Sequence, residues 1–267
     1  MADLRRNIQA LGKALDAEPI ARGFDERSSA QPYRPPPDAR SVTVRELLVG
    51  SPRAGVTVEQ LSLLAAPGSE RGESVAVFVA GDVELLKRRC VSVIGTRKVS
   101  AEGAARARRL ARELAERDVV VVSGLAEGVD TAAMTSAIRS GGRTVGVIGT
   151  PLDSAYPARN KRLQEEVYQE HLLVSQFRPG DRVFKSNFPQ RNRLMALISD
   201  ATVVVEASDT SGTLHQASEC TRLGRWLFIA RSVVEDPRLT WPKRFLDYER
   251  CRVLAHTDDI IAAVYPA

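Results

Sequence analysis

The feature that most constrains the fold is a series of six apolar, β-branched runs that begins at Cys90. The runs are CVSVIG, VVVVSG, TVGVIG, LLVSQF, ATVVVEA and WLFIA, and stretches with a helical pattern lie between them. Such continuous hydrophobicity is typical of strands that are buried on both faces of a parallel sheet. The alternation of these runs with helices predicts an α/β fold with a doubly wound, mostly parallel sheet.

Helix start and stop signals agree with this pattern. Ser100 and Ser211 stand where helix N-caps are expected, because a serine hydroxyl accepts a hydrogen bond from an unpaired N–H of the first turn. The pair Gly141-Gly142 and Gly224 stand where helices should end. The local signals and the hydrophobic period therefore indicate the same elements.

The length of 267 residues predicts one full domain with either an extension or a small second domain. Residues 1–40 join a short helical pattern to the stretch RSSAQPYRPPPDAR, which is typical of an extended or disordered linker. The alternating β-branched and helical patterns of residues 41–89 predict either a small α/β subdomain or extra elements on the main sheet. Residues 90–267 hold the main domain, and the segment after Trp226 should close it with a strand and a helix.

Composition narrows the function classes. Three cysteines and three histidines are scattered without CxxC, HxxxH or HExxH spacing, so we expect no zinc site, no disulfide framework and no cofactor. The N-terminus is amphipathic rather than a signal peptide, and no apolar run approaches the roughly 18 residues that span a bilayer. We therefore expect a reduced, cytoplasmic protein away from the membrane. Lys and Arg outnumber Asp and Glu by 38 to 33, and this small excess of positive charge is compatible with an anionic partner.

Two loops stand at the carboxyl ends of predicted strands, where ligands bind in open parallel sheets. The loop IGTRKVS offers Gly95 for close backbone approach and Arg97 and Lys98 for charge, although an ordinary βα turn explains it too. The loop SGLAEG, with Ser123 and Gly124, resembles a phosphate cradle or, alternatively, a close strand–helix junction. It lacks the GxGxxG spacing and the lysine of a P-loop, which disfavours nucleoside triphosphate hydrolysis.

A third loop leads from the run ATVVVEA into Ser211-Gly212-Thr213 at another helix start. Ser211 is better placed as a cap than as a nucleophile, because there is no GxSxG elbow and no histidine that the sequence places beside it. Glu206, at the end of the strand, suits the orientation of a basic neighbour or the capping of a helix.

The segment FRPGDRVFKSNFPQRNR interleaves phenylalanines with positive side chains. This composition suits phosphate contacts and base stacking, or a solvated loop that its phenylalanines anchor to the core. We expect Arg191 and Arg193 in the first turn of a helix, where cations are disfavoured by roughly 0.3–1 kcal/mol each. An anionic ligand, or Asp181 or Asp200, should compensate. The positive side chains are Arg178, Arg182, Lys185, Arg191 and Arg193.

These stretches together resemble the DNA-processing protein DprA (Smf) family over residues of about 90 to 231. The motifs YPxxN, here residues 156–160, and FPxRNR, here residues 188–193, make the resemblance specific. It implies an extended Rossmann-like fold, a basic pocket for single-stranded DNA, a homodimer, and presentation of DNA to a RecA-type recombinase in transformation or recombination. No catalytic residue is expected. The residues expected to bind DNA are Gly95, Thr96, Arg97, Ser123, Gly124, Lys185, Asn187, Phe188, Arg191, Asn192, Arg193, Ser211 and Gly212, with Phe184 or Phe188 free to stack on bases.

The chain departs from that family at several positions around the expected pocket. Met134 stands where the family usually has histidine, SGTLHQA replaces SGxLxTA, and FIAR replaces a VPG turn. We also expect no C-terminal winged helix and no helix-hairpin-helix module near the N-terminus.

Two other functions use a similar pocket. Phosphoribohydrolases of the lysine-decarboxylase-like (LOG) group cleave nucleoside monophosphates with a PGGxGTxxE loop, which Gly212-Thr213-Leu214 resembles. Here residues 208–211 replace the PGG stretch, and Gln216 stands at the position of the glutamate, which weakens the case for stabilising an oxocarbenium ion. A sensor that binds a free nucleotide without turnover is the other alternative.

Overall fold

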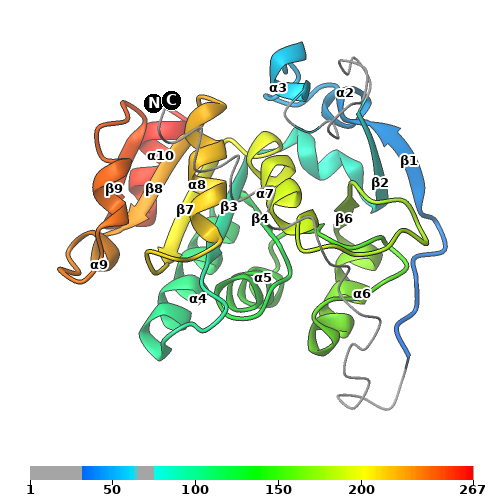
Figure 1. The fold of residues 1–267 in the computed structure, drawn as a ribbon, viewed down its shortest axis with the longest axis horizontal. Helices are drawn as coiled ribbons and strands as arrows, with labels where there is room; N and C mark the ends of the chain where they lie inside the picture. Colours follow the sequence, from blue (N-terminus) through cyan, green and yellow to red (C-terminus); the bar gives the residue numbers. More distant parts are fainter. Residues whose placement is uncertain (1–31, 63, 65–74, 267) are drawn as a thin grey trace.

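The computed structural model describes residues 32–62, 64 and 75–266. Within them, nine strands form one sheet in the order β1-β2-β6-β5-β4-β3-β7-β8-β9 (Figure 1). Across the sheet, every neighbouring pair from β6 through β5, β4, β3, β7 and β8 to β9 is parallel. At the β6 edge, β2 and β1 add two antiparallel strands. The predicted mostly parallel sheet is confirmed. The strands are β1 (Arg40–Thr43), β2 (Ala76–Gly81), β3 (Cys90–Gly95), β4 (Val120–Ser123), β5 (Thr144–Ile148), β6 (Leu172–Ser175), β7 (Ala201–Glu206), β8 (Trp226–Ala230) and β9 (Cys251–Leu254).

Helices cover both faces of the sheet, as a doubly wound fold requires (Figure 1). On one face pack α2 (Val44–Leu48), α3 (Val58–Ser62), α7 (Asn187–Leu197) and α8 (Thr213–Arg222). On the other pack α4 (Ala101–Glu116), α5 (Val129–Arg139), α6 (Lys161–Glu170) and α10 (Thr257–Val264). The short elements are α9 (Arg231–Val234) and the 3-10 helices η2 (Val83–Lys87), η3 (Ala158–Asn160) and η4 (Trp241–Arg244). None of the helices in these ranges is both long and apolar enough to cross a bilayer.

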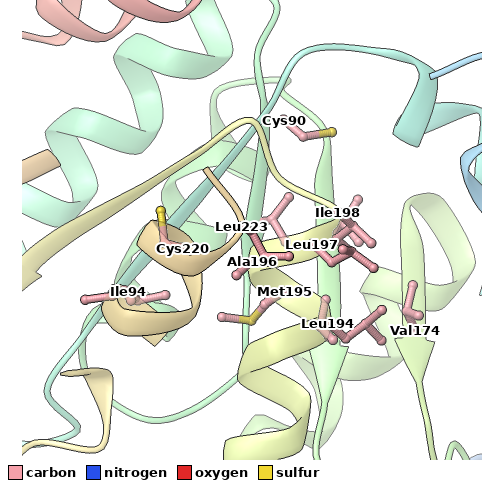
Figure 2. Packing of buried hydrophobic residues seen from close by; sticks show 14 of the residues in the cluster. Cys90, Ile94, Val174, Leu194, Met195, Ala196, Leu197, Ile198, Cys220 and Leu223 are labelled. Carbon is pink, nitrogen blue, oxygen red and sulfur yellow. The ribbon is translucent and has the colours of Figure 1, made fainter. Parts of the chain in front are cut away.

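The apolar runs are continuous because each strand supplies both faces. In β3, Val91 and Val93 point into the core under α4 and α5, whereas Cys90 and Ile94 point into the core under α7 and α8. Side chains alternate between faces along a strand, so a strand with two covered faces is apolar at every position. Figure 2 shows the second of these cores, in which residues 194–198 at the end of α7 lie among strand and α8 side chains.

Most of the predicted helix signals are confirmed. The Ser100 hydroxyl caps α4 and accepts a hydrogen bond from the N–H of Gly103 at 2.9 Å. Gly141 and Gly224 follow α5 and α8 with φ of +72° and +70°, in the left-handed region that glycine enters without strain. The cap predicted at Ser211 is displaced, because α8 has Gly212 as its N-cap residue. The Ser211 hydroxyl still accepts a hydrogen bond from the N–H of Thr213 at 3.2 Å.

Strands of the N-terminal region join the main sheet. β2 pairs with β1 and with β6, and Val44 and Leu48 of α2 belong to the same core as α7. β1 and β2 thus extend the main sheet at one edge. Within the predicted linker, Tyr33 donates to the carbonyl of Leu152 at 2.9 Å, which ties the extended chain to the body of the molecule. The helix predicted before the linker lies outside the described residues.

The end of the chain closes the sheet as expected. β9 pairs with β8, and α10 follows it and packs on α4. Ile260 of α10 completes the core under α4 and α5. The predicted closing strand and helix after Trp226 are therefore confirmed.

Candidate nucleic-acid interface

A cavity of about 330 Å³ lies where the strand order reverses. The chain moves outward from β3 through β4, β5 and β6, and then returns to place β7 on the other side of β3. The loops after β3 and β7 therefore diverge at the carboxyl edge, and this is where doubly wound proteins bind ligands. The cavity is walled by the loop after β3 and by the first turns of α7 and α8. Of the predicted residues, it is lined by Gly95, Thr96, Arg97, Phe188, Arg191, Asn192, Ser211 and Gly212.

Backbone contacts hold the loop after β3 at the cavity wall. The N–H of Thr96 donates to the carbonyl of Glu206 at 2.7 Å, and the N–H of Val129 donates to the carbonyl of Thr96 at 3.3 Å. Gly128 passes directly over this loop with φ of +79°, and a Cβ there would collide with the carbonyl oxygens of Thr96 and Arg97. Glycine at position 128 is therefore required for the shape of the site.

The Glu206 carboxylate is occupied by internal partners. It accepts hydrogen bonds from the N–H and the hydroxyl of Ser100 at 2.8 and 2.6 Å, and Arg106 contacts it at 3.1 Å. Both roles expected for Glu206 are thus present, since it orients a basic neighbour and supports the start of α4. This carboxylate does not line the cavity.

The mouth of the cavity combines charge with flat side chains. Arg97 and Lys98 are exposed. The Arg97 guanidinium lies 5.5 Å from the centroid of the Phe188 ring, and the centroid of the Tyr156 ring lies 5.4 Å from that of Phe188, with the two rings tilted by 53°. A second cavity of about 210 Å³ continues past these rings and is lined by Gly124 as well as by Arg97 and Phe188. Aromatic and guanidinium surfaces that gather in this way are suited to stack on bases.

Arg191 is buried, with only 6% of its surface exposed. Its Nη1 donates to the carbonyl of Val147 at 3.0 Å, and the guanidinium occupies the space that a side chain at Gly124 would fill. Asp130 faces the same space and accepts hydrogen bonds from the N–H groups of Gly124 and Ala126 at 3.0 and 3.4 Å. Glycine at 124 therefore makes room for a guanidinium of the protein itself.

The two charges partly compensate for each other's burial. Burial lowers the pKa of Arg191, and the Asp130 carboxylate opposes this shift. Burial likewise raises the pKa of Asp130, and Arg191 opposes that shift. α7 begins at Asn187, so the expectation that Arg191 and Arg193 lie in its first turn is wrong. Both lie in the second turn, where the helix dipole is weaker, and the carboxylate whose charge opposes the shift of Arg191 is that of Asp130.

The structure does not bring every predicted residue to the cavity. Ser123 is fully buried and donates to the carbonyl of Val93 at 2.7 Å. Asn187 is buried too, and Arg193 pairs with Glu219 at 3.4 Å. Lys185 is exposed just before α7 and lines neither cavity. DNA contact by these four residues stays a prediction.

The two aspartates proposed as internal partners are engaged elsewhere. Asp181 accepts a hydrogen bond from the N–H of Arg178 at 2.8 Å within its own loop. Asp200 pairs with the fully buried side chain of Arg53 at 2.6 Å, and it also accepts from Tyr265 at 2.8 Å. Neither compensates for Arg191 or Arg193.

Gln216 is a cavity residue that the site prediction omitted. It is 1% exposed, and its side-chain Nε2 has no hydrogen-bond acceptor in the described part of the chain. A buried donor without a partner typically costs about 1–3 kcal/mol, so a ligand that supplied an acceptor would gain by binding here. The departure SGTLHQA from the SGxLxTA pattern was the signal that could have identified it.

Positive charge dominates the lining of the cavity. Arg97, Lys98 and Arg191 face one carboxylate, that of Asp130. Over the residues that the structure describes, no group of three His, Cys, Asp or Glu side chains could hold a metal ion. The groups that converge here are cationic side chains and the ring of Phe188, and this set suits a phosphate-bearing ligand.

The fold and the cavity define a doubly wound, Rossmann-like α/β protein with a mostly cationic crevice at the reversal of strand order. The family model of DNA recombination-mediator protein A matches residues 70–265, and the chain belongs to this family. The match includes β2 and every later strand of the sheet.

Relatives support this assignment over part of their length. The DNA processing protein DprA of Streptococcus pneumoniae is 42% identical over 154 residues, which make up 58% of this chain and 54% of the relative. Protein Smf of Escherichia coli is 33% identical over 163 residues, or 61% of this chain and 44% of the relative. The chain thus spans about half the length of these relatives.

Solved structures show the same fold. DNA processing protein A from S. pneumoniae aligns with a TM-score of 0.67 and 32% identity, over 85% of this chain and 74% of that one. DNA processing protein A from Helicobacter pylori, studied for its single-stranded DNA binding mode, aligns with a TM-score of 0.64 and 26% identity. That alignment covers 76% of this chain and 90% of the H. pylori chain.

Proposed function

We propose that this protein binds single-stranded DNA across the cavity at the carboxyl edge of the sheet and acts in DNA recombination. The observation that carries the proposal is the mouth of the cavity, where exposed Arg97 and Lys98 stand beside the neighbouring, mutually tilted rings of Phe188 and Tyr156. A single strand presents both phosphates and base faces, and these cationic and aromatic side chains complement both. The single-stranded DNA binding studied in the H. pylori relative supports the same ligand.

Phosphate contact and stacking fall to different residues. Arg97 and Lys98 hold the phosphates at the mouth of the cavity. The exposed side chains of Arg178, Arg182 and Lys185, before α7, extend the positive surface. Phosphate contacts and stacking carry no sequence information, so we expect little sequence preference.

The carboxylates of Glu206 and Asp130 are engaged by internal partners, which fits a protein that binds its ligand without hydrolysing it. Glu206 is held by Ser100 and Arg106, and Asp130 is buried and accepts two backbone hydrogen bonds. Gln216 stands where the LOG loop has its glutamate. None of these groups is placed to act as the general acid or base that hydrolysis needs.

Affinity measurements at two salt concentrations test the proposal. We expect single-stranded DNA to bind more tightly than duplex DNA, RNA or mononucleotides. In an Arg97→Ala/Lys185→Ala variant, the slope of log affinity against log salt should fall by about 0.7 for each lost phosphate contact. Binding and slope that stay at the wild-type values in this variant would refute the phosphate assignment. Tightest binding of a mononucleotide would support the sensor, and release of free base from nucleoside monophosphates would support the enzyme.

The partners in this proposal come from the family. We propose a cytoplasmic homodimer that presents bound DNA to a RecA-type recombinase. Light scattering at several protein concentrations tests the dimer, because a mass that stays at 29.2 kDa throughout contradicts it. A strand-exchange assay with and without the protein tests the recombinase step.

A further inference from the structure

A second hollow, of about 590 Å³, lies on the surface between α4 and α5. Figure 1 shows these two helices side by side on one face of the sheet. Small residues such as Ala104, Ala132 and Ser136 line the hollow, so the two helices approach closely at its floor. We call this hollow the α4–α5 groove. It is distinct from the cavity between the loops after β3 and β7.

The α4–α5 groove is strongly basic. Four arginines line it, and Glu127 is the one acid among its lining residues. Neither Arg108 nor Arg139 forms an ion pair within the described ranges. Arg112 lies 3.6 Å from Glu116 on the same helix. Ion pairs between exposed side chains contribute little, so this pair leaves Arg112 able to bind another anion. The arginines are Arg108, Arg112, Arg139 and Arg159.

The groove adjoins the proposed DNA site. Glu127 lines both the α4–α5 groove and the 210 Å³ cavity beside Tyr156. That cavity shares Arg97 and Phe188 with the larger cavity at the strand ends. The three hollows therefore lie next to one another on the molecule, with shared residues between them. At the junction, Arg159 pairs with Glu127 at 3.1 Å, and the Arg159 side chain is 68% exposed.

We propose that the α4–α5 groove binds the phosphate backbone of the single strand where it leaves the cavity. The inference rests on the proposed function, because it extends the same ligand beyond the same site. A strand longer than the cavity has to continue over the surface, and a basic path that adjoins the site attracts it within a Debye length. Arginine suits this role because its planar guanidinium can bind a phosphate with two hydrogen bonds.

Two oligothymidylates separate the groove from the cavity. Single-strand site sizes run from about 4 to 16 nucleotides, so one oligonucleotide of about 4 and one of about 16 are compared. In an Arg108→Gln/Arg112→Gln/Arg139→Gln variant, the salt slope for the longer one should fall by about 2, at about 0.7 per contact. Binding of the shorter one should match the wild type. Replacing the same three residues with lysine keeps the charge and should preserve most of the slope.

A matched control removes three exposed charges elsewhere. Arg40, Lys87 and Arg250 are exposed and line neither the groove nor the two cavities, so their replacement with glutamine should leave both oligonucleotides unaffected. At the junction, Glu127→Gln removes the one lining acid and frees Arg159, so affinity for the longer oligonucleotide should rise.

Four outcomes decide between the two proposals. An unchanged slope in the triple glutamine variant, with both oligonucleotides still bound, overturns the groove and leaves the cavity site intact. Equal weakening of both oligonucleotides also overturns the groove as a separate extension. A wild-type protein that binds neither oligonucleotide refutes the DNA site itself. A slope that falls equally in the control variant shows that the effect comes from net charge and refutes the groove.

Discussion

Arg191→Met tests whether this arginine serves the protein interior rather than a ligand. Arg191 and Asp130 are 6% and 5% exposed, so water can do little to compensate for the lost guanidinium. The hydrogen bond to the carbonyl of Val147 is lost as well. Removal of one partner from a buried charge pair typically costs about 3–5 kcal/mol. Each kcal/mol lowers Tm by about 2–4 °C in a protein of this size, so we expect a fall in Tm of about 10 °C.

The assay is thermal and urea unfolding, with Arg97→Met as the matched control. Arg97 undergoes the same chemical change at an exposed position, and such changes typically alter stability by no more than about 0.5 kcal/mol. The Arg191→Met/Asp130→Asn double variant removes both charges and should recover part of the lost stability. This coupling measures the charge interaction directly.

The pH dependence gives a second signature. Burial raises the pKa of Asp130 above 3.8, and loss of Arg191 removes the charge that opposes this rise. The folded Arg191→Met variant therefore binds a proton more readily than its unfolded chain does. Its stability should recover relative to the wild type as the pH falls through the raised pKa of Asp130.

Two results would refute this reasoning. If Arg191→Met were as stable as Arg97→Met but its salt slope for single-stranded DNA fell by about 0.7, Arg191 would be a phosphate ligand, as the sequence alone suggested. A stability loss that is the same at every pH would show that packing, and not the Asp130 charge, is responsible.

Three further predictions concern other positions. Arg97→Met should weaken single-stranded DNA binding and lower its salt slope by about 0.7; an unaltered slope in a binding titration would contradict the contact. Gln216→Leu removes a buried donor that lacks a partner, so the free energy of unfolding should stay constant or rise, by up to about 1–3 kcal/mol. The DNA affinity of Gln216→Leu should fall if the ligand supplies the acceptor for this amide. A lower free energy of unfolding in urea would show instead that the Gln216 amide has a partner within the protein. Burial lowers the pKa of His171 below 6.5, so stability should decrease as the pH falls from about 6.5 toward that lowered pKa. His171→Gln should remove this part of the acid dependence, and identical pH profiles would refute its origin in His171.

Much of the fold could be predicted from the sequence, because many of its elements depend on interactions within a few residues. Whether a run is apolar at every position or a serine precedes a helix is decided within a few residues, so the strands from β3 to β8 and the cap at Ser100 could be predicted. The loops that line the cavity follow from the same pattern, because the carboxyl ends of parallel strands share one edge of a sheet. The sequence alone therefore determined the fold class, the edge of the sheet that holds the cavity, and Arg97 and Phe188 as residues that line it.

Only the tertiary structure decided which charges meet. Arg191 and Asp130 come from different helices, and packing places one opposite the other, so an arginine expected to contact DNA faces an internal carboxylate. Arg193 and Asp200 likewise have partners that local sequence does not indicate. The basic groove depends on how α4 and α5 lie against each other. The pKa and accessibility of a charged side chain depend on everything packed around it, and long-range topology brings those neighbours together.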